Sequence, residues 1–310
     1  MIRITLLGGV NIRGSDGSTA DIQTRRGEEL FAFLVLESGR MFSRSALAGQ
    51  FWGDLPEERA RRALNTELWR LTSALRPVGF DVEAVLVRTR REIGYRLQKD
   101  IWVDVHQLST ARAIIVSTRP ENADAGALKA VDDAIRAYRG DLLESVYSDW
   151  CLIWRESLRA LFTEALEFML NACMARREWA EALHYARRLL ELDPLMEHVH
   201  RAAMRCHFLN GDRPMALHQY ALCEQVLRDE LDVAPMEETR LVRQAVLTTE
   251  SASSPQACLR APDPAAADPS FADRRLAARK LEMALSNLNS ARGWLEEIGR
   301  DLSETPHANR

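Results

Sequence analysis

The chain has 310 residues, of which 46% are hydrophobic and 28% charged, and its formal net charge is −4. This length accommodates two or three domains with a sizeable core, and the slightly acidic balance excludes a surface that coats nucleic acid uniformly while leaving room for a local basic patch. The five cysteines form no CxxC pair or zinc spacing, and neither a signal-peptide pattern nor a long apolar run is present, so we expect reduced thiols, no membrane span and a cytoplasmic location.

Two or three short strands and two helices are expected first. Residues 2–7 and 10–13 form short strand-like runs separated by Gly8-Gly9 and followed by the turn GSDGS. Residues 25–38 then place their large apolar side chains on one side of a first helix, which Gly39 ends. Ser43 is the expected cap of a second, shorter helix.

The segment 56–76, PEERARRALNTELWRLTSALR, predicts a third helix with two contrasting faces. Its apolar residues recur at helical spacing and must lie against a core. Asp54 is the expected N-cap, and Glu67 is the only acidic residue between Arg59 and Arg76. The opposite face carries side chains whose donors suit base edges or phosphates, namely Arg59, Arg61, Arg62, Asn65, Thr66, Trp69 and Arg70. This face indicates a recognition helix, and the alternative for the segment alone is an ordinary amphipathic helix with a charged exterior.

Two further strands are expected at 80–87 and 93–97, joined by a basic turn. Strands, three helices and a hairpin, in this order, form a winged helix-turn-helix, in which the third helix enters the major groove and the hairpin wing touches backbone or minor groove. The side chains expected to hold the DNA backbone are Arg44, Arg88, Thr89, Arg90, Arg91 and Tyr95. Residues 1–100 contain 16 Lys and Arg against 13 Asp and Glu, so this region has a small basic excess although the whole chain is slightly acidic.

Residues 101–249 have the pattern of long helices. One is expected in ALKAVDDAIRAYRGDLL, with a stop at Gly140, and a longer one from Trp150 to Arg177. The segment WAEALH at 179–184 is followed by the similar segment RPMALH at 213–218. The two segments are 34 residues apart, and 34 residues is the period of tetratricopeptide (TPR) repeats. We therefore expect a TPR-like helical-repeat domain, with a plain helical bundle as the alternative.

The last part of the chain is predicted to be a linker followed by a helix. Residues 250–270 are rich in proline and small residues without periodicity, which is typical of a flexible linker. Residues 271–303 carry a leucine stripe that predicts a C-terminal amphipathic helix. Three fates are open for this helix, namely docking on its own chain, pairing with a second copy or binding another partner. Of these we favour docking within a homodimer.

Several segments along the chain carry a family likeness. They are ITLLGGVNIR, LVLESGR, MFSRSALAGQFWGD, ARRALNTELWRLTSALR, IGYRL and VDV, then AYRGDLL, SDWCLIWRESLRAL, LLELDPLMEHVHRAAMRCHFLNGDRPMALHQY and RDELDVAPMEETRLV. In these segments the chain resembles the antibiotic regulatory protein (SARP) activators of bacteria. The resemblance covers residues 2–247 and implies a mainly α chain, with an OmpR-type winged helix at 1–100 and a TPR-like bacterial transcriptional activator domain at 101–249. Two features depart from the family. Gly27 and Glu28-Glu29 stand where a Pro-Lys-type start of the first helix is common, and the linker with the last helix has no counterpart.

An enzymatic function is not expected. Gly8-Gly9 is not followed by the lysine of a P-loop, no GxSxG motif occurs, and His198 and His200 would point to different sides of a helix. No cofactor or metal is therefore predicted.

We expect a sequence-specific transcriptional activator that binds double-stranded promoter DNA through its winged helix. The TPR-like domain would engage a second copy, as a homodimer, or the RNA polymerase holoenzyme, as the resemblance implies. The rival is a TPR-based signalling adaptor whose winged helix is a protein-interaction module; the face with Arg61, Arg62 and Asn65 favours the first function. Whether a small-molecule effector binds the TPR-like domain is left open by the sequence.

Overall fold

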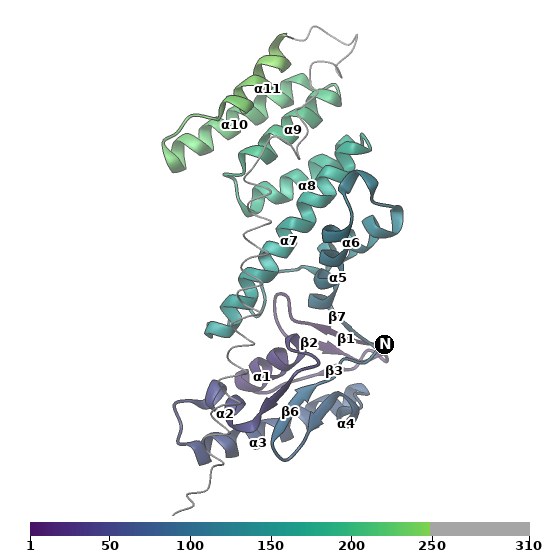
Figure 1. Ribbon diagram of the computed structural model, residues 1–310, viewed down its shortest axis with the longest axis vertical. Helices are drawn as coiled ribbons and strands as arrows, with labels where there is room; N and C mark the ends of the chain where they lie inside the picture. The colour runs from purple at the N-terminus through teal and green to yellow at the C-terminus, as the bar shows by residue number, and fades with distance from the viewer. Residues whose placement is uncertain (249–310) are drawn as a thin grey trace, which may run out of the picture. The chain divides into compact units, whose positions relative to one another are not determined.

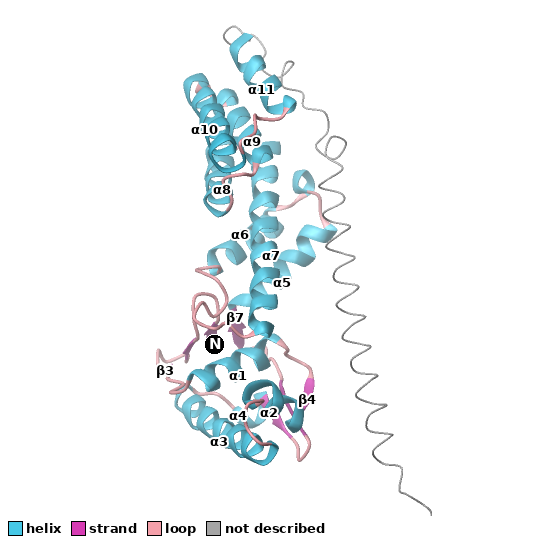
Figure 2. Cartoon of the chain, turned by 90° about the vertical axis from the view of Figure 1, so that its left-hand side faces the viewer, coloured by secondary structure: helices cyan, strands magenta, loops and turns pink. Residues whose placement is uncertain are grey.

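The computed structural model describes residues 1–248, and the linker predicted at 250–270 and the helix predicted at 271–303 lie outside the described residues. Two small sheets with their helices come first along the chain, and a series of helices follows (Figures 1 and 2). The mainly α fold predicted from the sequence is confirmed.

The first sheet contains the N-terminal strands and one strand from much later in the chain. Strand β1 (Ile2–Thr5) pairs antiparallel with β2 (Asn11–Arg13), which pairs with β3 (Thr19–Ala20). On its other side β1 pairs in parallel with β7 (Ile101–Val103), so the strand order is β3-β2-β1-β7. The predicted early strands are confirmed.

Three helices follow the N-terminal strands. Helix α1 (Arg25–Leu36) is capped by Thr24, and α2 (Arg44–Trp52) is capped by Ser43 as predicted, because each hydroxyl accepts a hydrogen bond from a backbone N–H of the first turn. Helix α3 (Glu57–Leu75) starts after Pro56, which makes no side-chain cap bond. The prediction of Asp54 as its N-cap is therefore wrong: Pro56 takes the N-cap position, and Glu57 and Glu58 in the first turn face the positive end of the helix dipole.

The second sheet forms the hairpin wing. Strands β5 (Leu86–Arg88) and β6 (Glu92–Tyr95) pair antiparallel, and β4 (Met41–Ser43) pairs with the other edge of β6. The strand predicted at 80–87 is shorter than expected. After the 3-10 turn η1 (Arg76–Val78), Asp81 caps the short helix α4 (Val82–Val85), and the strand begins only at Leu86.

The helical half is joined to the N-terminal half by backbone bonds and side-chain packing. Asp104, the first residue of α5 (Asp104–Ser117), is buried and accepts hydrogen bonds from the backbone N–H groups of Leu6 (2.8 Å) and Leu7 (2.9 Å). Leu143 N donates to Leu6 O at 3.2 Å. Because β7 also belongs to the first sheet, residues 1–248 form one compact unit.

Two helices and an ordered loop follow α5. After the 3-10 turn η2 (Pro120–Asn122) comes α6 (Ala125–Ala137), and α7 (Asp149–Ala175) is the longest helix of the described part. The loop between them is held by buried Arg155 of α7, whose guanidinium donates to backbone carbonyls of this loop at 2.7 to 2.9 Å. These carbonyl acceptors satisfy a buried cation that forms no ion pair with a carboxylate of the described chain.

The last four helices form the predicted repeats. They are α8 (Trp179–Leu192), α9 (Glu197–Leu209), α10 (Arg213–Leu231) and α11 (Glu237–Thr248). Helices α8 and α10 start at the two positions that the sequence repeat equates, and their equivalent residues Ala182 and Ala216 are both fully buried. The small side chain lets the neighbouring helix approach closely, so the repeat read from the sequence corresponds to the packing. Within residues 1–248, no helix combines the length and the apolar character needed to cross a membrane.

Candidate nucleic-acid interface

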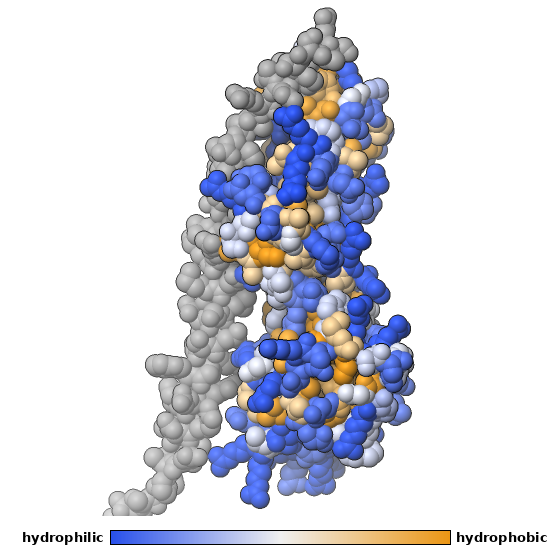
Figure 3. Space-filling view, turned by 90° about the vertical axis from the view of Figure 1, so that its right-hand side faces the viewer, coloured by the Kyte–Doolittle hydropathy of each residue, from blue (hydrophilic) through white to orange (hydrophobic). Residues whose placement is uncertain are grey.

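Helix α3 buries one face and exposes the other along its whole length. Its buried face consists of Ala60, Leu64, Leu68, Leu71 and Leu75, each at most 3% exposed. The seven side chains predicted to contact DNA are all exposed, namely Arg59, Arg61, Arg62, Asn65, Thr66, Trp69 and Arg70. In Figure 3, hydrophilic side chains dominate the lower end of the view, where the winged helix lies.

Trp69 is the most exposed of the large apolar side chains on α3, with 69% of its surface accessible. Tryptophan is a residue that folding normally covers over most of its surface. An indole this exposed contributes little to the core of its own chain, so it is available to a binding partner.

Two arginines near the start of α3 are paired with the glutamates of the first turn. Arg61 lies 2.7 Å from Glu57, and Arg62 lies 3.2 Å from Glu58. All four side chains are more than half exposed, and such pairs contribute about 1 kcal/mol or less. A phosphate or a base edge can therefore replace either glutamate at low cost.

Glu67 does not belong to the exposed face, although it is the only acidic residue in the middle of the helix. It is 5% exposed, accepts a hydrogen bond from the Thr24 hydroxyl and lies 3.3 Å from Arg70. A Cβ atom at Gly27 would lie 2.6 Å from the Glu67 carboxylate. Glycine at position 27, one of the departures from the family pattern, is thus explained by the close approach of Glu67.

The other departure from the family pattern is Glu28-Glu29, which places carboxylates at the start of α1. Glu29 is 3% exposed and lies 3.3 Å from Arg25 and 3.1 Å from Arg26. Both arginines therefore have a carboxylate partner.

The wing presents two arginines at its turn. Arg90 and Arg91 are exposed, and no hydrogen bond or ion pair of their side chains is found within the described residues. Thr89 has a structural role instead, because its hydroxyl accepts hydrogen bonds from the backbone N–H groups of Arg91 (3.2 Å) and Glu92 (2.8 Å) and so closes the turn. Arg88 donates to the Thr72 hydroxyl of α3 at 3.3 Å, which ties the wing to that helix.

Arg44, at the start of α2, lies between the wing and α3. Its Nε donates to Thr89 O at 3.1 Å, and its Nη1 donates to Asn65 Oδ1 at 2.7 Å. The sequence places Arg44 among the backbone contacts, whereas in the structure two of its donors are already used within the protein.

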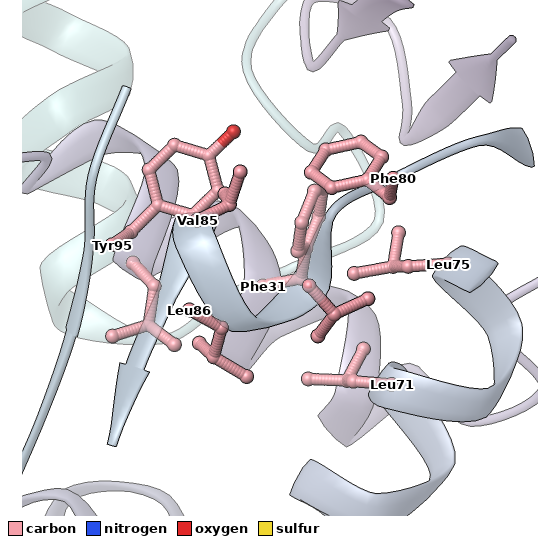
Figure 4. A pocket seen from close by; sticks show the side chains of 9 residues that line it. Phe31, Leu71, Leu75, Phe80, Val85, Leu86 and Tyr95 are labelled. Carbon is pink, nitrogen blue, oxygen red and sulfur yellow. The ribbon is translucent and has the colours of Figure 1, made fainter. Parts of the chain in front are cut away.

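Tyr95 is a correction to the predicted contact surface. Its side chain is 2% exposed, its ring packs edge-on against Phe31 with centroids 6.2 Å apart, and burial raises the pKa of its hydroxyl. Figure 4 shows this ring among the side chains that line an apolar pocket, including Phe80 and Leu75. Tyr95 therefore belongs to the core of the winged helix and cannot reach DNA while the hairpin is folded.

Ser45 is a residue of this surface that the sequence did not indicate. Its hydroxyl accepts a hydrogen bond from Arg61 at 2.8 Å, so the first turn of α2 lies beside the exposed face of α3. Its position directly after Arg44 was the available signal. A serine in the first turn of a helix is usually read as part of the cap, and this one orients a neighbouring arginine.

The described residues contain no group of three His, Cys, Asp or Glu side chains placed to hold a metal ion. Their four cysteines are free and buried. The surface chemistry of the site is therefore that of arginine, asparagine, threonine and tryptophan side chains, which suits nucleic acid.

Three comparisons identify similar proteins. Residues 103–247 match the family described as Bacterial transcriptional activator domain. The chain is 23% identical over 245 residues to the transcriptional regulatory protein MoaR1 of Mycobacterium tuberculosis, covering 77% of this chain and 76% of that protein, and it matches MoaR1 of Mycobacterium bovis equally.

The fold is also similar to a solved structure, that of Mycobacterium tuberculosis EmbR in complex with a low-affinity phosphopeptide. The TM-score is 0.63 at 19% identity, over 83% of this chain and 68% of that one. This likeness concerns the fold. The domain match and the related regulators support the resemblance to SARP-type activators, and residues 103–247 correspond to a bacterial transcriptional activator domain.

Proposed function

We propose that the protein activates transcription by binding promoter DNA in a sequence-specific manner through the winged helix of residues 1–100. In this proposal α3 reads base edges in the major groove, and the wing arginines Arg90 and Arg91 hold the phosphate backbone. The activator domain of residues 101–249 then engages RNA polymerase holoenzyme or a second copy of the chain.

The observation that carries this proposal is the composition of the exposed face of α3. Four arginines, an asparagine, a threonine and a largely exposed tryptophan occupy it, and its only buried acidic residue, Glu67, faces the interior. Arginine and asparagine are the side chains that read guanine and adenine edges. After Glu57 and Glu58 in the first turn, α3 exposes no carboxylate, and a helix that only had to be soluble would gain nothing from this exclusion.

A selection from a random pool of duplex DNA with the full-length protein is the direct test. Recovered sequences should share a motif, and fluorescence anisotropy at fixed salt should give binding to that motif at least about 10³-fold tighter than to a scrambled duplex. Equal affinity for both duplexes would contradict the proposal. Binding to neither would favour the signalling adaptor, in which the winged helix contacts protein.

The partners of the activator domain need separate tests. Transcription in vitro from a template with the selected motif should rise when the protein is added to purified RNA polymerase holoenzyme, and a template with a scrambled motif is the control. Light scattering at micromolar concentration, with the full chain and a chain truncated after Glu250, tests whether a homodimer forms and whether the segment 251–310 contributes to it.

A further inference from the structure

Arg44 connects three elements of the winged helix. Its backbone N donates to Arg91 O at 2.8 Å and its Nε to Thr89 O at 3.1 Å, so it is bound to both sides of the wing turn. Its Nη1 donates to Asn65 Oδ1 of α3 at 2.7 Å. One residue at the start of α2 thus fixes the wing and a side chain of the exposed face of α3 relative to each other.

This contact determines which end of the Asn65 amide faces outward. A guanidinium has only donors, so the amide atom that it meets must be the oxygen. The hydrogen bond is short and charge-assisted, which makes it stronger than one between neutral groups. With Oδ1 held against Arg44, the Nδ2 group and its two N–H donors are left for a partner.

The base recognised by a free asparagine differs from the base expected for Asn65. Asparagine reads adenine by using both amide atoms, because Oδ1 accepts from N6 while Nδ2 donates to N7. Arg44 occupies one lone pair of Oδ1 and orients the amide, so Asn65 presents its Nδ2 donors. Guanine is the base with two adjacent major-groove acceptors, O6 and N7.

We propose that Arg44 is a positioning residue that sets the base preference of Asn65, directing its amide donors toward guanine at one position of the site. This inference rests on the proposed DNA binding by α3. It replaces the phosphate contact predicted for Arg44 from the sequence. The guanidinium charge lies beside the wing, which Arg44 contacts at Thr89 O.

A charge-conserving substitution separates the two roles of Arg44. A phosphate contact tolerates lysine, which is a good point charge, whereas a fork that reaches two acceptors at fixed geometry does not. The experiment compares the wild-type chain with Arg44→Lys, Asn65→Ala and the double variant, using the full-length protein on duplexes that vary every position of the selected motif. Arg90→Lys is the matched control, because no side-chain bond of Arg90 is found within residues 1–248.

Arg44→Lys should lower discrimination by about fivefold or more at one base pair, the lower end of the contribution of a good side-chain contact to a base. Asn65→Ala should lower discrimination at the same base pair, and the double variant should be no worse than Asn65→Ala alone. The salt dependence of binding and the affinity for scrambled DNA should change little in Arg44→Lys, and Arg90→Lys should keep the wild-type preference.

A further variant guards against a general disturbance of the surface. In Asn65→Asp a carboxylate keeps Arg44 in place but has no donors, so the protein should melt at the wild-type temperature or above it and still lose the preference. The inference is overturned if Arg44→Lys keeps the wild-type preference, if the two single effects add, or if an A·T pair is preferred over a G·C pair at that position. It is also overturned if Asn65→Ala leaves every preference unchanged, whereas the proposed function fails only if no motif is bound at all.

Discussion

The indole of Trp150 meets the ring of Phe33 edge-on, with ring centroids 5.3 Å apart. Trp150 lies near the start of α7, and Phe33 lies on α1; the indole also approaches Phe51 of α2 at 6.1 Å. These contacts join the helices that support α3 to the longest helix of the activator domain. A substitution at this point of the activator domain should therefore also disturb the packing of the winged helix.

Trp150→Ala should destabilise the protein by about 2 to 4 kcal/mol, somewhat below the usual cost for a fully buried aromatic side chain because Trp150 is only partly buried. Urea unfolding followed by circular dichroism measures the effect. Trp150→Phe should cost much less, because it keeps an aromatic ring and removes an indole N–H that has no hydrogen-bond partner within the described residues.

The matched control is Trp69→Ala. The same atoms are removed from a side chain that is 69% exposed, so the free energy of unfolding should change by about 0.5 kcal/mol or less. Equal destabilisation by both alanine variants would show that Trp150 does not stabilise the junction. Trp69→Ala should instead weaken DNA binding.

Asp104 should make stability depend on pH in the direction opposite to that of a salt-bridged carboxylate. Burial raises the pKa of its carboxyl to about 6, against an ordinary value of 3.8, even though backbone N–H groups of Leu6 and Leu7 favour the charged form. A folded-state pKa above the unfolded value means that the folded chain binds the proton more tightly. The contribution of this group therefore rises as pH falls from 7.5 to 5.

Comparison with Asp104→Asn isolates this contribution, because the amide does not titrate. The free energy of unfolding of the wild type minus that of the variant should increase by about 1 to 2 kcal/mol between pH 7.5 and pH 5. Urea titrations at both pH values give the difference. A decrease over this range would mean that the hydrogen bonds outweigh burial and that the pKa lies below its ordinary value.

The features that could be predicted from the sequence are those set by local chemistry. Ser43 caps α2, and Gly39 adopts a φ of +89° at the turn after α1, because capping and left-handed backbone depend on a few adjacent residues. The repeat was visible because WAEALH and RPMALH occupy the same packing environment twice. The third helix followed from its helical period of apolar residues.

The features that were missed depend on partners far away in the sequence. Strand β4 has three residues, and only its pairing with β6 makes it a strand. Tyr95 is buried because Phe31 of α1 packs against it, which no local pattern reveals. The burial of Glu67 was also missed, although it could have been predicted locally. Glu67 lies three residues after Leu64 and four before Leu71, so it falls on the apolar stripe of the helix.

Arg62→Ala and Asn65→Ala are expected to relax sequence preference. Both side chains lie on the exposed face in the first half of α3, and loss of a good base contact costs about 1 to 3 kcal/mol of discrimination. Anisotropy titrations with the selected motif and single-base variants measure this. Arg228→Ala is the matched control for Arg62→Ala, because Arg228 also forms an exposed pair with a glutamate four residues earlier, at 3.6 Å. Unchanged ratios of specific to scrambled binding in both variants would remove these residues from the reading surface.

The wing arginines should behave differently from those of α3. Arg90→Ala and Arg91→Ala should each weaken binding to all duplexes by a similar factor, because a phosphate contact carries no sequence information. Each should also lower the slope of log K against log salt by about one, since one fewer counterion is released.

Arg88 differs from Arg90 and Arg91 because its side chain also bonds to α3. Its replacement can therefore be compared with theirs. Its guanidinium donates to Thr72 at 3.3 Å, and Arg88→Ala should therefore lower the free energy of unfolding by about 1 kcal/mol, whereas Arg90→Ala and Arg91→Ala should leave it unchanged. Binding titrations from about 50 to about 200 mM salt, together with urea unfolding of the same three proteins, test both parts. A salt slope that stays at the wild-type value in Arg90→Ala and Arg91→Ala would show that the wing does not neutralise phosphates. Phosphate binding would then depend on the arginines of α3, such as Arg61, and on Arg44 at the start of α2.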